Sequence, residues 1–341
     1  MKKFTKGCLI TALVLFVLGC AFYIICGVMG GFGQLKAWNG HTFHMWGHEM
    51  RLAYSGYGFW YITDADADSG VEPADWADNG DQVGKGEKEK TEYSASDVWR
   101  LDIECGGNNL VIKESEDDYI WIARDSEAWP VKYKLQDGTF KLYSEKSFHW
   151  WGDWRWNERT ERTVYLYLPE GMTLNSIDLE IGAGELECMS LKADEIDVEV
   201  DAGAAVIESL YGKEVELSVN AGGMEVEEVT AEELNGQTGA ASLVIGNFSA
   251  EEVSLTASAG SQEVYGKIGR NADIECEAGS ITMTIQGAEA DYDYELECSL
   301  GEIRIGGNTY RDLNDQRTIR NGGKGVLDIE CSVGTIEIDF D

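Results

Sequence analysis

The chain has 341 residues with 62 Asp or Glu against 27 Lys or Arg, a formal net charge of -35 at pH 7. Three of the basic residues lie in the first 33 positions, which contain no acid, so the remainder carries 24 basic against 62 acidic side chains, or -38. Such a surface repels nucleic acid and attracts cations or cationic polymers, which excludes a nucleic-acid-binding role. The 40 glycines and only 3 prolines suit many tight turns between strands.

Residues 1–33 have the pattern of a membrane anchor. Lys2, Lys3 and Lys6 precede an uncharged run to residue 33, which is longer than the roughly 20 residues that span a bilayer. We therefore expect a cytoplasmic amino terminus, one transmembrane helix and the rest of the chain outside. Val-Leu-Gly-Cys, ending at Cys20, is also similar to a lipoprotein signal, so a lipid anchor is the alternative, although the residues after Cys20 stay apolar.

Residues 34–92 are expected to form a juxtamembrane linker, because they are rich in aromatic residues at first and acidic later. His41, His44 and His48 could ligate a metal, but their spacing is loose. The alternative is an aromatic segment that lies at the membrane–water interface.

Three alternating carboxylates in the linker are a weak candidate for a calcium site. Asp64, Asp66 and Asp68 would begin a calcium loop, but Ser69 and Asp75 occupy the positions where such a loop needs glycine and glutamate. A solvated acidic spacer is the simpler interpretation, and calcium is the one cofactor that the sequence suggests.

Residues 93–175 contain predicted strands. The segment 98–115 predicts two strands across a turn at Gly106 and Gly107, and its sequence is echoed at 326–341. Four further strands follow, with Asp137-Gly138 as a hairpin signal.

A loop between two of these strands contains four tryptophans, Trp150, Trp151, Trp154 and Trp156. Exposed aromatic rings mark interaction sites, so this loop could be a binding tip for sugars, lipid or peptide. The alternative is a lid over the open end of the core.

The sequence repeats every 19 residues between residues 176 and 287. The apolar positions that enter each copy are Ile177, Ile196, Val215, Leu234 and Val253. The seventh, fifth and third residues before each turn glycine are apolar, whereas the sixth and fourth are mostly acidic or small and polar. This alternation predicts a strand with one buried face, and a second short strand follows each glycine.

A fixed period in this range predicts an all-β fold, a repeat β-solenoid of two-stranded coils, over residues 93–341. An antiparallel sandwich or meander is the alternative, because a glycine turn also closes a hairpin. Leu179 would lie beside Val198 in the solenoid, and beside Leu186 across the turn in a hairpin.

Stacking in register would align the outward carboxylates. The sixth positions are Asp178, Asp197, Glu216, Asp273, Glu295 and Asp328, and the fourth positions are Glu180, Glu199, Glu275, Glu297 and Glu330. We expect acidic columns, without Lys or Arg on them, that attract calcium or a cationic peptide. A solvated face that keeps the protein soluble is the alternative.

Five cysteines follow residue 33: Cys105, Cys188, Cys276, Cys298 and Cys331. Each occupies an inward position of its strand, where cysteine acts as a small apolar residue, so we expect buried thiols.

The segment TVYLYLPEGMTLNSIDLEIGAGELE and the copies that follow resemble the bacterial putative-adhesin family of β-strand-repeat proteins, a domain family of unknown function. The resemblance covers residues 93–341 and implies no catalytic residues. It implies a role in adhesion or in sensing envelope stress, including cationic antimicrobial peptides.

The chain lacks a Gly-x-Ser-x-Gly motif, a phosphate-binding loop and paired zinc cysteines. We therefore expect a membrane-anchored, extracytoplasmic, non-catalytic binding protein, with cationic peptides, envelope polymers or host glycans as partners. An envelope-stress sensor is the alternative, and a carboxylate-dependent polysaccharide-cleaving enzyme is a remote one.

Overall fold

The computed structural model describes residues 42–45, 48–55, 59–64, 81–82, 88–125, 128–144, 162–311 and 313–341, with side chains from residue 93 on except 313–316. The chain divides into two compact units, residues 1–77 and 78–341, and each is treated separately. Among these described residues, no helix is long and apolar enough to cross a membrane. The expected anchor, residues 1–33, lies outside them.

The first unit contains a small antiparallel sheet. Its strands are β1 (Thr42–Met45), β2 (His48–Ser55) and β3 (Phe59–Asp64), with β2 in the middle. These strands lie within the span 34–92, which the sequence analysis treats as a linker.

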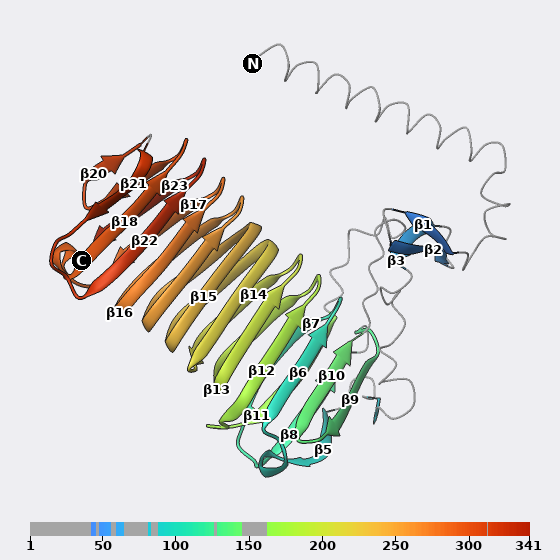
Figure 1. Ribbon diagram of the computed structural model, residues 1–341. Coiled ribbons are helices and arrows are strands. Elements are labelled where there is room, and N and C mark those ends of the chain that lie inside the picture. Colours follow the sequence, from blue (N-terminus) through green and yellow to red (C-terminus); the bar gives the residue numbers. More distant parts are fainter. Residues whose placement is uncertain are drawn as a thin grey trace. The chain divides into compact units, whose positions relative to one another are not determined.

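The second unit is a stack of two-stranded coils (Figure 1). The first strands of successive coils form one parallel sheet, called sheet I here, and the second strands form a facing parallel sheet, sheet II. Leu179 lies beside Val198, and Val198 lies beside Leu217, at the predicted offset of 19 residues. This parallel register confirms the solenoid-like stacking and contradicts a hairpin across Gly184.

The regular coils occupy the centre of the unit. Their strands are β12 (Leu174–Ile181), β13 (Glu185–Val200), β14 (Ala204–Tyr211), β15 (Glu214–Ala257), β16 (Ser261–Cys276) and β17 (Ser280–Ile285). The 44 residues of β15 pass through several coils because the chain bends from one sheet into the other without a break.

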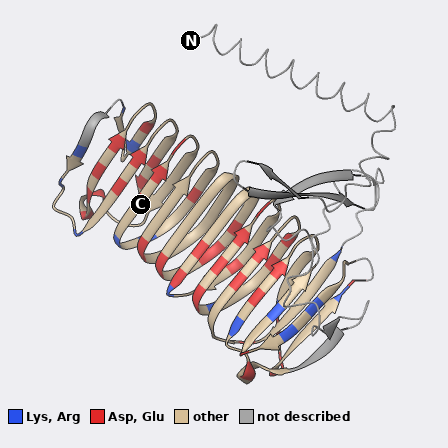
Figure 2. Cartoon of the chain, turned by 45° about the vertical axis from the view of Figure 1, so that its right-hand side comes forward, with Lys and Arg blue, Asp and Glu red and all other residues tan. Residues whose placement is uncertain are grey.

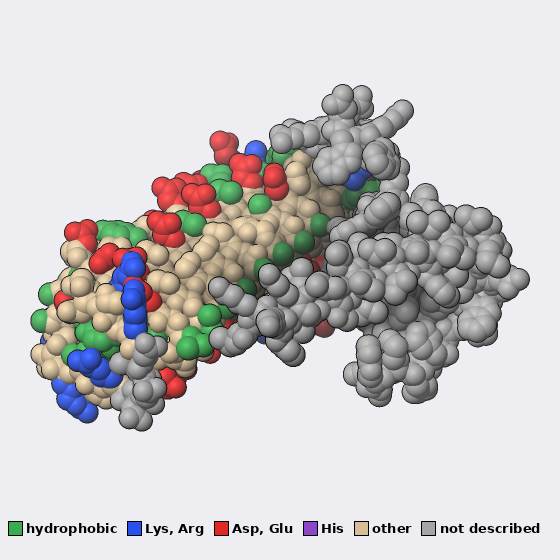
Figure 3. All heavy atoms as spheres, turned by 90° about the horizontal axis from the view of Figure 1, so that it is seen from above, with side chains coloured by type: hydrophobic (Ala, Val, Ile, Leu, Met, Phe, Trp, Pro, Cys, Tyr) green, Lys and Arg blue, Asp and Glu red, His purple; other side chains and the backbone are tan. Residues whose placement is uncertain are grey.

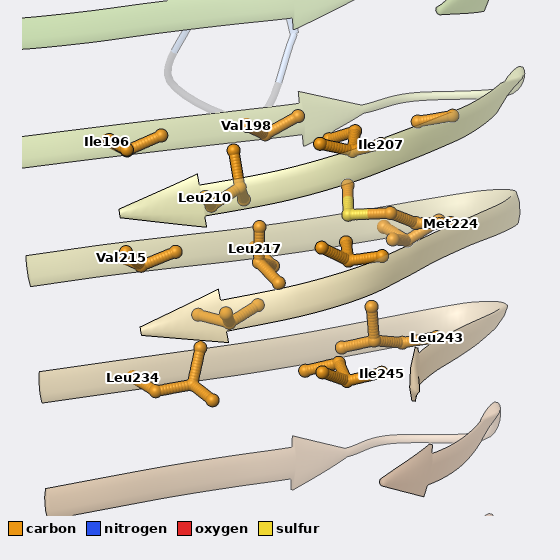
Figure 4. Packing of buried hydrophobic residues seen from close by; sticks show 14 of the residues in the cluster. Ile196, Val198, Ile207, Leu210, Val215, Leu217, Met224, Leu234, Leu243 and Ile245 are labelled. Atoms are coloured by element: carbon orange, nitrogen blue, oxygen red, sulfur yellow. The ribbon is translucent and has the colours of Figure 1, made fainter. Parts of the chain in front are cut away.

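The core lies between the two sheets. Figure 4 shows Ile196 and Val198 of sheet I on the same interior side as Ile207 and Leu210 of sheet II. These side chains are at most 2% exposed. Burying a side chain of this kind contributes about 1.5–3 kcal/mol, so the apolar columns are the main source of stability.

The turn glycines are required by the stacking itself. A Cβ at Gly203 would overlap the carbonyl oxygen of Gly184 in the preceding coil, and a Cβ at Gly222 would overlap that of Gly203. Gly222 also has a φ of +123°, which L side chains rarely adopt. The repeated glycine therefore reflects the close approach of successive turns.

The N-terminal end of the stack departs from chain order. The strands there are β4 (Asp81–Gln82), β5 (Lys88–Ser94), β6 (Arg100–Cys105), β7 (Asn109–Ser115), β8 (Tyr119–Arg124), β9 (Val131–Gln136), β10 (Thr139–Ser144) and β11 (Thr163–Pro169), with the 3-10 turn η3 (Ala95–Asp97) after β5. The coil β6–β7 lies between β12–β13 and β10–β11. Asp137 and Gly138 have positive φ and join β9 to β10, which confirms the hairpin signal.

The C-terminal end repeats this arrangement. Its strands are β18 (Tyr292–Cys298), β19 (Glu302–Ile305), β20 (Asn308–Tyr310), β21 (Leu313–Ile319), β22 (Gly325–Cys331) and β23 (Thr335–Phe340), with the 3-10 turn η4 (Glu289–Asp291) before β18. The last coil in the chain, β22–β23, is inserted between β16–β17 and β18–β19 (Figure 1).

Antiparallel strands cover both ends of the stack. β9 and β8 pair with β10 and β11 at one end, and β21 and β20 pair with β18 and β19 at the other. A paired edge cannot recruit another chain, which is the usual requirement for the ends of a solenoid. The two segments that share the sequence Leu-Asp-Ile-Glu-Cys, at 101–105 and 327–331, therefore both occupy the coil next to a capped end.

The insertion predicts that the C-terminal coil holds its neighbour in place. A chain ending after Lys324 loses β22 and β23, which are the parallel partners of β18 and β19. We expect amide hydrogens in residues 292–305 to lose protection from exchange, whereas residues 196–219 keep it, because local opening follows lost contacts. Unchanged protection over residues 292–305 would contradict the insertion.

Candidate functional site

The outward face of sheet I carries two adjacent columns of carboxylates near the N-terminal end. In the first, Asp102, Asp178, Asp197 and Glu216 are neighbours in register. Adjacent strands in such a sheet lie about 4.8 Å apart. The red blocks in Figure 2 show these columns crossing several strands.

The second column runs parallel to the first and contains Glu104, Glu180 and Glu199. It ends at Ser218, which is the next residue in register after Glu199. The predicted alignment of Asp178, Asp197, Glu216, Glu180 and Glu199 is therefore confirmed, and Asp102 and Glu104 extend it.

In these two columns, neutral residues separate the first acidic group from a second one. The next coils hold Asn235, Gln237, Ser254 and Thr256 in the columns, although Glu233 and Glu252 lie beside them on the same face. The carboxylates then resume as Asp273, Asp328 and Glu295 in one column and Glu275, Glu330 and Glu297 in the other. Figure 3 shows acidic side chains gathered along one flank of the described body.

Partial burial, together with the charges of neighbouring carboxylates, changes the acid–base behaviour of these residues. Partial burial and the charges of Glu216, Asp178 and Glu199 raise the pKa of Asp197 to about 6. Partial burial also raises the pKa of Asp178, with repulsion from Asp102 as the next cause. In the second group the pKa of Glu330 is raised for the same reasons, burial first and Glu297 second.

A lysine at the N-terminal end and amide donors farther along relieve part of the repulsion. Lys141 lies in register with Asp102, and its ammonium is 2.6 Å from the carboxylate. The expectation that no lysine lies on these columns was wrong, because the repeat begins after Lys141 and the inserted coil β6–β7 brings them together. Asn220 Nδ2 donates to Glu199 at 3.0 Å, and Gln237 Nε2 donates to Glu216 at 3.1 Å.

The weak metal candidates stay untested. His44, His48 and Asp64 belong to β1–β3, where only the backbone is described, and His41, Asp66 and Asp68 lie outside the described residues. Within the part of the chain that the structure describes, no group of three or more His, Cys, Asp or Glu could hold a metal ion.

The tryptophans of the expected binding tip, Trp150, Trp151, Trp154 and Trp156, also lie outside the described residues. Their loop joins β10 to β11, the position that a tight turn occupies in the regular coils. The fully buried Asn108 fixes its start, because Asn108 Nδ2 donates to Ser144 Oγ at 2.7 Å. The strands β8 and β9 already pair with the end coil, so a lid is not needed to complete the backbone hydrogen bonds of β10 and β11.

Sequence reasoning missed a trough on the outward face of sheet II. We call it the sheet II trough, and its volume is about 730 Å³. The residues that line it come from β7, β11, β13, β14 and the turns between strands: Asn109, Val111, Lys113, Thr163, Tyr165, Ala183, Gly184, Glu185, Glu187, Ala202, Gly203 and Ala204. The face is hollow at this place because the turn residues are glycine and alanine, whereas β11 and β13 carry larger side chains on either side. In the sequence, Tyr165 and Tyr167 alternate with buried leucines, and this pattern could have indicated an aromatic outward face.

The five described cysteines are buried thiols, as predicted. Cys331 lies in register between Cys276 and Cys298. Burial raises the pKa of Cys331 to about 11 and that of Cys105 to about 12, which keeps both in the unreactive thiol form.

Comparison with protein families identifies the fold. The model of the family described as Toastrack DUF4097 matches residues 98–339, so the chain belongs to that family. A comparison with curated proteins gives no match.

Several solved structures are similar to the chain. One titled a putative adhesin, from Bacteroides fragilis, is 13% identical with a TM-score of 0.39, and the match covers 74% of this chain and 97% of that one. Another putative adhesin, from Parabacteroides merdae, is 13% identical with a TM-score of 0.41 and coverages of 75% and 98%. A structure titled a putative lipid binding protein, from Parabacteroides distasonis, is 12% identical with a TM-score of 0.34 and coverages of 75% and 97%.

The raised pKa of Asp197 predicts a specific dependence of stability on pH. Since its pKa rises from 3.8 to about 6 on folding, the folded state binds more protons between these values. Stability should fall as the pH rises through this window and stay lower above it. At pH 7.5, Asp197→Asn should raise the free energy of unfolding by roughly 0.5–1 kcal/mol, the size of other half-exposed charge interactions.

Asp194→Asn is the matched control, because Asp194 forms an exposed ion pair with Lys213 at 2.9 Å. Its removal should leave stability unchanged or slightly lower. Chemical denaturation at pH 7.5 and pH 4 measures both variants. An Asp197→Asn variant less stable than wild type at pH 7.5 would show that its neighbours do not repel it.

Proposed function

We propose that the chain is a membrane-anchored, non-catalytic binding protein of the bacterial cell envelope, adhesin-like, with residues 34–341 outside the cytoplasm. The Lys-rich start and the uncharged run that follows support the anchor and its orientation. The excess of acidic residues after residue 33 suits an outer surface that meets cationic polymers or peptides.

The observation that carries this proposal is the pair of in-register acidic columns around Asp178 and Asp197. Charges of one sign at ladder spacing cost folding energy, since two unit charges at 4 Å repel by about 1 kcal/mol in water and by more near a protein surface. Lys141 pairs with one member of the columns, Asp102, and so relieves this repulsion at one end. A cationic partner laid across the strands would offset this repulsion along its whole length.

A regulator that senses cationic peptides is the second candidate function. The separate group around Asp273 and Glu330 favours it, because two acidic zones on one face can engage one long polycation at both ends. Binding at both zones would raise the affinity through effective concentration without any new kind of contact.

An experiment on intact cells tests location and binding together. Cells that express the full chain should bind a fluorescent Lys-rich peptide, and protease added outside should remove both the C-terminal part and the bound peptide. Peptide that binds only after lysis would reverse the topology, because the columns would then face the cytoplasm.

The columns are tested by comparing two variants of equal charge. Replacing Asp178, Asp197 and Glu216 with Asn, Asn and Gln should weaken peptide binding about tenfold or more at low salt, because the three charges act together. Replacing Glu263, Glu337 and Asp339 with Gln, Gln and Asn on sheet II removes the same charge and should have a smaller effect. If both variants lose the same affinity for the peptide, net charge alone governs binding and the columns are only a solvated face.

A further inference from the structure

We propose that the sheet II trough binds a polymer of amino sugars with free amines, with a sugar ring against Tyr165 and ammonium groups on Glu185 and Glu187. This inference deepens the proposed binding function, and it concerns the face opposite the acidic columns of sheet I. It rests on the shape of the trough, on the Tyr165 ring in its lining and on the carboxylates that line it.

The trough has the size and the lining of a site for a chain of rings. Its volume of about 730 Å³ is within the range of small-molecule sites, but it is open along the face. Its floor at Ala202, Gly203 and Ala204 lacks large side chains, which lets a flat ring approach the sheet. Backbone groups of the neighbouring strands are paired in the parallel ladders, so a peptide cannot add to the sheet as another strand there.

One aromatic side chain, Tyr165, lines the trough, and two more continue the row beyond it. Tyr165 is half-buried and lies in register with Val111, which is also part of the lining. Tyr167 is on the same face, and Trp121 lies directly beside it in β8. Asp117 holds the Trp121 indole in place, because its carboxylate accepts the Nε1 hydrogen bond at 2.8 Å. A rigid aromatic row is suited to the apolar C–H face of a sugar ring.

Carboxylates line the trough and continue beyond it. Glu185 and Glu187 belong to the trough itself. A second groove of about 530 Å³ shares Val111, Lys113 and Glu187 with it and adds the carboxylates Glu208, Glu225 and Glu227. Each of three successive coils therefore offers at least one carboxylate. Glu187 and Glu225 lie in one row two strands apart, a distance of about 9.6 Å that is close to the length of two sugar rings.

The apolar residues between these carboxylates fit the same ligand. Val206 is 55% exposed and lies in register between Glu187 and Glu225, and Met189 is 40% exposed beside them. Alternating apolar and carboxylate groups suit sugar rings that carry amines. Lys113, whose ammonium is 5.6 Å from the centre of the Tyr165 ring, adds a donor for ring hydroxyl or acetyl oxygens. The ligand is therefore an amino-sugar polymer with at least some free amines.

Calorimetry on the full chain in detergent tests the proposal with four probes. These are an oligomer of glucosamine, the same oligomer fully N-acetylated, a glucose oligomer of equal length and an oligolysine of equal charge. The glucosamine oligomer should bind at least tenfold more tightly than either neutral sugar, because only it carries amines. Equal binding of an uncharged oligomer would overturn the assignment of Glu185 and Glu187.

Variants then separate the ring contact from the charge contact. Tyr165→Ala should lower the affinity for the glucosamine oligomer at least tenfold and leave oligolysine binding unchanged, whereas Tyr165→Phe, which keeps the ring, should behave as wild type. Glu185→Gln combined with Glu187→Gln should weaken the binding of the glucosamine oligomer. Circular dichroism and the melting temperature check that each variant is folded; if Tyr165→Ala does not fold, loss of sugar binding in the Glu185→Gln, Glu187→Gln variant decides.

Two results would overturn the proposal. The first is an unchanged affinity of a folded Tyr165→Ala variant for the glucosamine oligomer. The second is oligolysine that binds more tightly than the sugar and loses affinity in the Glu185→Gln, Glu187→Gln variant, which would make the trough a peptide site. Glu263→Gln with Asp339→Asn is the control on sheet II, outside the trough and outside the acidic columns, and there the affinity for the sugar should stay unchanged. If the sugar does not bind in the trough but a polycation still binds to the sheet I columns, this inference is wrong and the proposed binding function stands.

Discussion

The structure depends on one constraint: parallel strands stack in register, so each side chain lies beside its equivalent 19 residues away. Like residues are therefore brought together whatever their chemistry. Apolar columns such as Leu179, Val198 and Leu217 gain from this and form the core. Glycine columns permit the turns to approach, since a Cβ at Gly203 would overlap the turn before it. Acidic columns destabilise the stack, because equal charges become nearest neighbours.

The fold tolerates the acidic columns because neighbouring residues limit the charge repulsion within them. The second column ends at the neutral Ser218, and the first column meets Lys141 at one end, where Lys141 pairs with Asp102. The raised pKa of Asp197, about 6, means that a modest fall in pH removes one of the central charges. A chain that needed stability alone would have placed opposite charges on adjacent coils. The retained repulsion is consistent with a surface whose charges are used by a cationic partner.

Sequence reasoning succeeded where the 19-residue repeat is regular. The alternation of apolar and polar residues predicted the inward positions, and the Asp137-Gly138 signal predicted a real hairpin. It could not predict the order of the end coils, because Leu-Asp-Ile-Glu-Cys at 101–105 and 327–331 suits any place in the stack equally well. Only tertiary pairing puts each of them second from a capped end. The sheet II trough was missed for a related reason, since β7, β11 and β13 are joined by register and not by sequence.

The register can be measured directly by cross-linking engineered pairs of cysteines. Glu187 and Val206 are neighbours on the outward face of sheet II, so the double substitution E187C and V206C should form a disulfide on mild oxidation. A hairpin across Gly184 would instead bring Asp178 to Glu187, whereas the stack puts these residues on opposite outward faces. The account predicts a cross-link in the first pair and none in the pair D178C and E187C. A cross-link in the second pair with none in the first would contradict it.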